Sequence, residues 1–167
     1  MARFNDRQPQ FRIVNSIGLV IEGPYRFDVA SGAPATYGVT FEGADASEHE
    51  EYAGQWTNFA WQRVGYALGY RYAVSLRFVA CEASAFGNYG LTLLHHLWRT
   101  AVETQLTYGG LQFSMYQGAA WHPVVPDSGQ GWAPTPTAGK QGFFDVTMAF
   151  QTRNLVATPG EWAVAQW

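Results

Sequence analysis

The stretch Tyr70-Arg-Tyr-Ala-Val-Ser-Leu-Arg-Phe-Val-Ala80 carries the strongest structural pattern in the chain. Every second residue from Tyr70 to Phe78 is large and apolar or aromatic, and the residues between them are Arg, Ala or Ser. A period of two places alternate side chains on opposite faces of a β-strand. This segment is therefore predicted to be a strand with one face in the core.

The same alternation recurs on both sides of this strand. We expect clear strands at 36–42, 111–116 and 143–150, and weaker ones at 11–15, 17–22, 25–29 and 58–64. Turn residues such as Glu22-Gly23-Pro24 separate them. The 167 residues are enough for one domain. The sequence therefore predicts a single, mainly β domain over 1–167, built as a two-sheet sandwich or a small barrel.

One segment has a helical period instead. It lies between Asn88, a suitable N-cap, and Gly109, a suitable C-terminal stop. Apolar residues recur there every three to four positions, which predicts one α-helix at about residues 88–106 flanking the sheet. Because the apolar arc is wider than half of the helix, we expect the helix to be covered on two sides.

The composition excludes several classes of protein. The chain has 47% apolar and 14% charged residues and a net charge of −3, which rules out a disordered chain and disfavours general nucleic-acid binding. Cys81 is the only cysteine, which excludes a disulfide scaffold. No apolar run approaches the roughly 20 residues of a membrane helix. The first ten residues lack the apolar core of a secretory signal, so we expect a chain made in the cytoplasm.

No recognisable catalytic, metal or cofactor motif is present. Glu48-His-Glu-Glu51 lacks the second histidine of a His-Glu-x-x-His site, so a solvated loop or a contact for a partner's arginine is expected. His95 and His96 would point about 100° apart on a helix. Cys81 is predicted to be a buried thiol, and Asp127-Ser-Gly-Gln-Gly131 lacks the lysine of a phosphate loop. We therefore predict no enzyme, no metal and no cofactor.

The segment 118–142 and the chain ends contain aromatic residues that lie outside the predicted strands and helix and so are not assigned to their core. The segment has five Gly and four Pro but also two Trp, and long irregular loops of this kind are usually functional. We expect it to contact neighbouring subunits, together with an N-terminal arm (1–9) and a C-terminal arm (157–167). The expected interface residues are Trp121, Val124, Val125, Trp132, Trp162, Val164, Trp167, Phe4 and Arg99.

The order of the predicted elements resembles that of the tail-tube and distal-tail proteins of tailed bacteriophages. N-terminal strands precede the long strand 68–80, with Gly69-Tyr-Arg-Tyr-Ala-Val-Ser-Leu-Arg-Phe-Val79 at its centre, and the helix, a strand, the long loop and a last strand follow. Members of that family are β-sandwiches or small barrels with one flanking helix, and they assemble into hexameric rings.

The resemblance implies a structural virion protein that is assembled in the host cytoplasm. It would be a subunit of a homo-oligomeric ring in the tail tube, the distal tail of the baseplate, or an adaptor. Its partners would be copies of itself and neighbouring tail proteins, with no specific nucleic acid and no membrane. A capsid-decorating protein is a further alternative.

Two other classes of function stay open at this point. A carbohydrate-binding β-sandwich could stack a glycan on Trp121, Trp132 and Tyr116. A small metal-dependent enzyme could use His49, Glu50, His95 or His122. A monomer that binds glycan, or stoichiometric metal in the purified protein, would distinguish these classes from a ring subunit.

Overall fold

A computed structural model describes residues 9–27, 36–57, 63–83, 89–103, 110–114, 120–127 and 131–154, with the backbone alone described at 36, 48–57 and 63–69. The elements are β1 (Gln10–Val14), β2 (Val20–Arg26), the 3-10 turn η2 (Thr36–Gly38), β3 (Thr40–Thr57), β4 (Arg63–Glu82), α1 (Gly90–Glu103), β5 (Gly110–Ser114), β6 (His122–Pro126), β7 (Thr135–Pro136) and β8 (Phe143–Thr152). The predicted class, mainly β with one helix, is confirmed.

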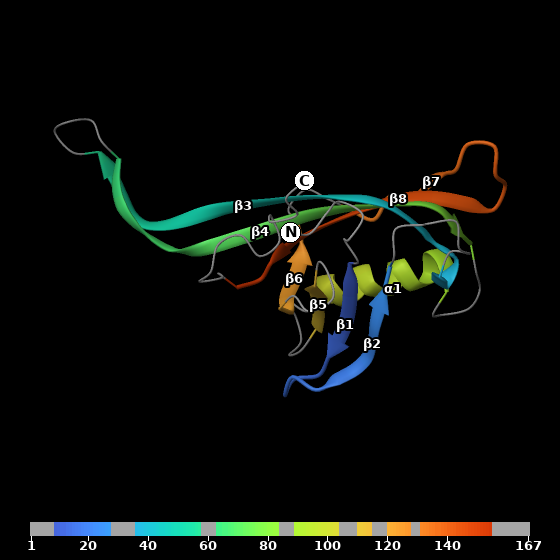
Figure 1. Cartoon of the computed structure of the whole chain (residues 1–167), viewed down its shortest axis with the longest axis horizontal. Coiled ribbons are helices and arrows are strands. Elements are labelled where there is room, and N and C mark those ends of the chain that lie inside the picture. Colours follow the sequence, from blue (N-terminus) through green and yellow to red (C-terminus); the bar gives the residue numbers. More distant parts are fainter. Residues whose placement is uncertain are drawn as a thin grey trace, which may run out of the picture.

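The eight strands that the structure describes form one antiparallel sheet in the order β2-β1-β5-β6-β8-β4-β3, with β7 paired to β8 beside this path. β6 joins the two halves because it pairs with β5 on one side and with β8 on the other. Figure 1 shows β1, β2, β5 and β6 running across the direction of β3, β4 and β8. Among the described strands the sheet is not closed into a barrel, since β2 and β3 remain its two edges.

Aromatic side chains from both halves of the sheet meet in the core. The ring centroid of Phe11 in β1 lies 5.1 Å from that of Phe113 in β5 and 5.6 Å from that of Phe150 in β8. Trp98 of α1 packs against Phe150 as well, with the centroids 5.4 Å apart. Burial of apolar surface stabilises a fold by about 25 cal/mol per Å², so this shared cluster holds the two halves and the helix together.

β4 has the alternation that the sequence predicted. Tyr72, Val74, Leu76 and Phe78 are all buried, whereas Arg77 is exposed. The strand is longer than expected because it pairs with β3 between Arg63 and Val79 and with β8 between Ala73 and Glu82. The strand with the strongest sequence pattern therefore contributes four buried side chains to the core.

β3 and β4 form a hairpin that extends beyond the rest of the sheet. The prediction of a loop at Glu48–Glu51 is wrong, because this backbone lies in β3 and pairs with Gly69–Tyr72 of β4. β8 pairs with β4 only from Ala73 onward, so the outer part of the hairpin is a two-stranded ribbon among the described strands. Figure 1 shows this ribbon leading away from the other elements on the left.

The segment predicted as one irregular loop, 118–142, contains β6 and β7. The prediction is wrong for these residues, and β6 is an internal strand of the sheet. Its sequence, His122-Pro-Val-Val-Pro126, does not predict an internal strand, because proline has no N–H to donate to a neighbouring strand. β6 nevertheless pairs with both neighbours through the residues around Val124.

α1 lies within the predicted range and packs against β4, β5 and β6. Leu93, Leu94, Leu97 and Ala101 form its fully buried face. Val102, an apolar residue of the same helix, is exposed, so the described residues do not fully cover the helix on a second side. The predicted cap and stop, 88 and 109, lie outside the described residues.

Candidate interaction surface

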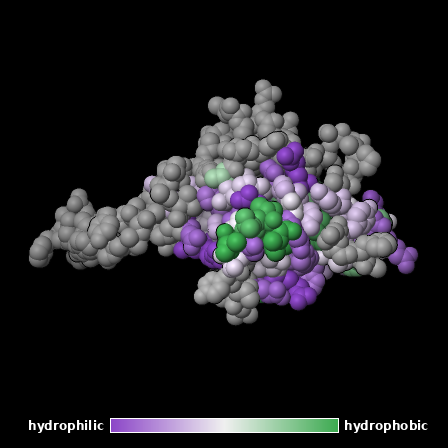
Figure 2. Space-filling view, turned by 90° about the horizontal axis from the view of Figure 1, so that it is seen from below, coloured by the Kyte–Doolittle hydropathy of each residue, from purple (hydrophilic) through white to green (hydrophobic). Residues whose placement is uncertain are grey.

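The hairpin between β1 and β2 exposes aliphatic side chains to solvent. Ile17, Leu19 and Ile21 are 77%, 60% and 60% exposed, and Val20 is 45% exposed. We call these four residues the hairpin patch. Figure 2 shows an apolar area, coloured green, on the side where this hairpin faces the viewer. Contiguous exposed apolar surface on a folded protein marks an interaction site more often than isolated apolar residues do.

Polar contacts of the backbone form the turn that presents the hairpin patch. The side-chain oxygen of Asn15 accepts hydrogen bonds from the amides of Ile17 (3.1 Å) and Leu19 (2.9 Å). The amide of Gly18, at a φ of 84°, donates to the carbonyl of Asn15. Because Asn15 holds the turn without help from the aliphatic side chains, these side chains are left pointing into solvent.

The patch continues along an edge of the sheet. β2 is the outermost strand on its side, so its outer backbone groups have no strand partner among the described residues. Pro24 limits further pairing near the end of β2, since it has no N–H. Val20 and Ile21 therefore form the part of this edge that is best suited to pair with another strand.

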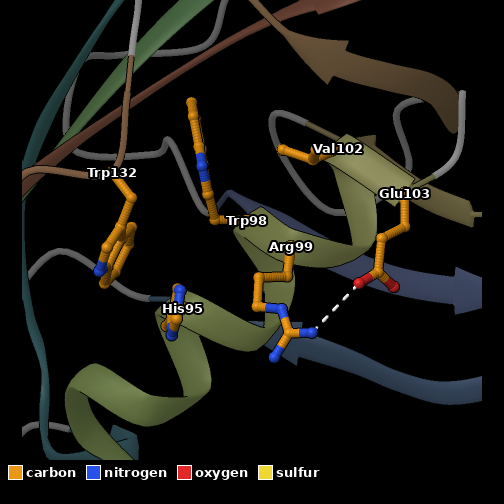
Figure 3. Close-up of a pocket in the computed structure, with 6 residues that line it drawn as sticks. All are labelled: His95, Trp98, Arg99, Val102, Glu103 and Trp132. Atoms are coloured by element: carbon orange, nitrogen blue, oxygen red, sulfur yellow. Dashed lines mark hydrogen bonds and ion pairs between the residues drawn. The ribbon is translucent and has the colours of Figure 1, made fainter.

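A groove of about 410 Å³ forms a second surface along α1. Figure 3 shows the six side chains that line it, which are His95, Trp98, Arg99, Val102, Glu103 and Trp132. Two of the predicted interface residues, Arg99 and Trp132, thus come together although they lie far apart in the sequence.

The two ends of the groove differ in chemistry. At one end the ring of Trp132 stacks on that of His95, with the centroids 4.8 Å apart and the planes inclined by 23°. At the other end Nη2 of Arg99 donates to Oε1 of Glu103 over 3.3 Å. The groove therefore offers an aromatic platform beside a pair of exposed, oppositely charged groups.

The other predicted interface residues are not brought to one place. Trp121 lies over the guanidinium of Arg12, 4.3 Å from the ring centroid, and Val125 is half-buried in β6. Val124 is fully buried in the core, so it presents no surface to a partner, and its prediction as an interface residue is wrong. The remaining four, Phe4, Trp162, Val164 and Trp167, lie outside the described residues.

The described histidines that were considered for catalysis or metal binding each contact a different partner. His96 pairs with Glu22, whereas the ring of His122 packs edge-on against Tyr72. The side chains of His49 and Glu50 lie outside the described set. Within the described ranges, no group of three or more His, Cys, Asp or Glu side chains could hold a metal ion.

Cys81 is a buried thiol, as predicted. Burial, together with the nearby carboxylate of Asp145, raises the pKa of Cys81 to about 12. Only the thiolate is a good nucleophile, and very little of it exists near neutral pH at such a pKa. The side chain therefore serves as a small apolar residue of the core.

The hairpin patch was missed in the sequence, although a signal was present. Residues 17–21 read Ile-Gly-Leu-Val-Ile, a run of aliphatic residues without the polar alternation of a half-buried strand. A short apolar run of this kind is also typical of a strand buried on both faces. Only the position of β2 at the sheet edge shows that these residues are exposed.

Comparison with known proteins adds no family assignment. A scan against protein-family models finds no match for this chain, and neither does a search of curated proteins. In the part of the chain that the structure describes, no helix has the length and apolar character needed to span a membrane. Function is therefore inferred from the two surfaces described above.

Proposed function

We propose that this protein is a structural subunit that assembles with copies of itself into a ring, a hexamer in a phage tail, and acts by assembly rather than by catalysis. The observation that carries the proposal is the hairpin patch on the edge strand β2. Burial of these four aliphatic side chains, which lie at the turn and at the start of β2, against a partner would lower the free energy of the assembly.

Pairing between sheet edges would explain how a second copy covers the patch. The sheet has two different edges, β2 and β3, and an edge strand with apolar side chains tends to pair with another chain. Pairing of unlike surfaces joins subunits head to tail, and a head-to-tail contact closes into a ring when the rotation per subunit allows it. Main-chain hydrogen bonds would then add to the burial of Val20 and Ile21.

The ribbon of β3 and β4 supports assembly independently. An isolated two-stranded ribbon is marginally stable in water. The outer part of this hairpin, formed by residues 48–57 of β3 and 63–72 of β4, pairs with no third strand in the described part of the chain. Packing against a neighbouring subunit would stabilise it, and the length of the hairpin allows it to reach one.

The place in a phage tail, and thus in a virion, rests on the resemblance in the order of elements. The long strand β4, the helix α1, the strand β5 and the last strand β8 occur in the predicted order, with β6 and β7 in the segment where one long loop was expected. Tube, distal-tail and adaptor positions all use such a subunit, so the proposal extends to a tail ring of any of these kinds.

The test is the mass of the full chain in solution, measured by light scattering after size exclusion and followed by negative-stain imaging. The proposal predicts closed rings, or tubes of stacked rings, with a mass several times that of the 18.5 kDa chain. A single species with the mass of one chain at every concentration tested would overturn it.

A further inference from the structure

We propose that the groove along α1, lined by Trp132, His95, Arg99 and Glu103, binds a neutral oligosaccharide. This would be a binding site beyond the assembly function, because neither edge of the sheet forms part of the groove. The groove is shallow and open to solvent, with a volume of about 410 Å³.

The aromatic end of the groove suits the apolar face of a sugar ring. Trp132 is partly exposed, and its stacking on His95 fixes the orientation of the indole and covers part of one face. A sugar ring would contact the part of the indole that His95 leaves uncovered. The face of an indole carries negative electrostatic potential, which attracts the positively polarised C–H groups on one side of a pyranose. Trp98 is buried beneath this region, so the platform lies on the core.

The polar end of the groove suits hydroxyl groups. Arg99 and Glu103 are 65% and 56% exposed in their side chains and lie 3.3 Å apart. A guanidinium offers several N–H donors in a plane and a carboxylate offers acceptors only, so together they match neighbouring hydroxyls, which both donate and accept. An anionic ligand would meet the carboxylate and a cationic one the guanidinium, which favours a neutral ligand.

The length of the groove favours more than one sugar ring. Figure 3 shows the lining side chains arranged along α1 from His95 to Glu103, with Trp132 beside His95. With a rise of 1.5 Å per residue, the distance along the helix from His95 to Glu103 is about 12 Å. One ring stacked on Trp132 would therefore leave the Arg99–Glu103 pair to a following ring.

The inference is tested by isothermal titration of the full chain, in its native assembly state, with cellohexaose, maltohexaose and chitohexaose. Three variants accompany the wild type: Trp132→Ala, Arg99→Gln and Trp121→Phe. Arg99 is exposed, so Arg99→Gln reports on the groove even where Trp132→Ala perturbs folding. Trp121 lies on Arg12, outside the groove, and serves as the matched aromatic control.

Saturable binding of at least one of the three sugars is expected. Trp132→Ala and Arg99→Gln should each raise its Kd about tenfold or more, whereas Trp121→Phe should change it by less than about twofold. Absence of binding to all three sugars at millimolar concentration would overturn the inference, as would binding that both groove variants leave unchanged. If instead Trp132→Ala lowers the mass of the assembly and no sugar binds, the groove is a subunit contact and the inference is wrong.

Discussion

The Nε2 atom of His96 in α1 lies 2.9 Å from Oε2 of Glu22 in β2. The same carboxylate oxygen accepts a hydrogen bond from the hydroxyl of Tyr25, 3.4 Å away. This pair joins the helix to the edge strand that carries the hairpin patch. The pair is therefore a direct contact between the proposed assembly edge and the helix that lines the groove.

We expect Glu22→Gln to lower the free energy of unfolding by about 0.5–1 kcal/mol, because the pair is partly exposed and therefore partly screened. Urea unfolding of Glu22→Gln, His96→Gln and the double variant gives the coupling between the two residues. The exposed pair Arg99–Glu103 is the matched control, with an expected coupling of about 0.3–0.5 kcal/mol. A coupling of zero for His96 and Glu22 would show that the helix does not hold the hairpin through this contact.

The hairpin patch should control assembly without controlling folding. In the variant Ile17→Lys/Ile21→Lys, both new charges are in solvent, so the thermal stability of the subunit should change by less than about 0.5 kcal/mol per site. Burying the same charges at a subunit contact is costly, so light scattering should show a shift to single chains. Val102→Lys, at an exposed aliphatic residue of α1, should leave the mass unchanged. An unaltered mass in the Ile17/Ile21 variant would contradict assembly through β2.

Gly90, the first residue of α1, is required by both its conformation and its surroundings. Its φ is +59°, and a Cβ at this position would collide with the carbonyl oxygen of Glu82 at the end of β4. Gly90→Ala should therefore lower the free energy of unfolding by at least about 2 kcal/mol. Gly139→Ala has a similar φ of +74° but open space around it, and should cost only about 1 kcal/mol. Equal losses in chemical denaturation would show that the helix start yields to the added atom.

Asp145 should make the protein less stable as the pH falls into the acid range. Its carboxylate accepts hydrogen bonds from the Thr137 hydroxyl (2.7 Å) and the Ala80 amide (3.0 Å), and these bonds lower the pKa of Asp145 in the folded state. A lowered folded-state pKa stabilises the native state at neutral pH. That contribution is lost as the pH falls through about 4 toward the folded-state value.

Thr137→Val removes the hydrogen bond that lowers the pKa of Asp145 most. The pKa of Asp145 should therefore rise, and the loss of stability in acid should become smaller. The measurement is the thermal midpoint from neutral pH down to about pH 2 for both proteins. Thr135→Val is the control, because the Thr135 hydroxyl is bonded to the main-chain oxygen of Asp145 and not to its carboxylate. Parallel curves for the wild type and Thr137→Val would refute a role for this hydrogen bond.

Cys81 should be unreactive while the protein is folded. Its pKa of about 12 leaves very little thiolate near neutral pH, and its burial limits the access of reagents. We expect no measurable reaction with a disulfide reagent at mildly alkaline pH, and full reaction of one thiol per chain once denaturant unfolds the protein. A fast reaction in the native state would mean that the end of β4 opens in solution.

The groove shows why the candidate site could be predicted only in part. Trp132 and Arg99 each stood out in the sequence, one as a loop tryptophan and one as a polar residue of an apolar helix. Nothing in their local patterns relates the two positions. They share a surface because the segment before β7 passes over α1, and that path depends on how β6 and β8 pair. The hairpin patch was hidden in the same way, since its exposure depends on the position of β2 in the sheet.

The sequence by itself determined the elements whose pattern is local. The alternation from Tyr72 to Phe78 and the helical period around Leu94 follow from which side of a strand or helix must avoid water, and neighbours in the chain express that requirement directly. Only the tertiary structure decided that β6 is an internal strand, that β3 continues through Glu48–Glu51, and which apolar residues stay exposed. Those outcomes depend on hydrogen bonds and packing between residues far apart in the chain, which no local pattern contains.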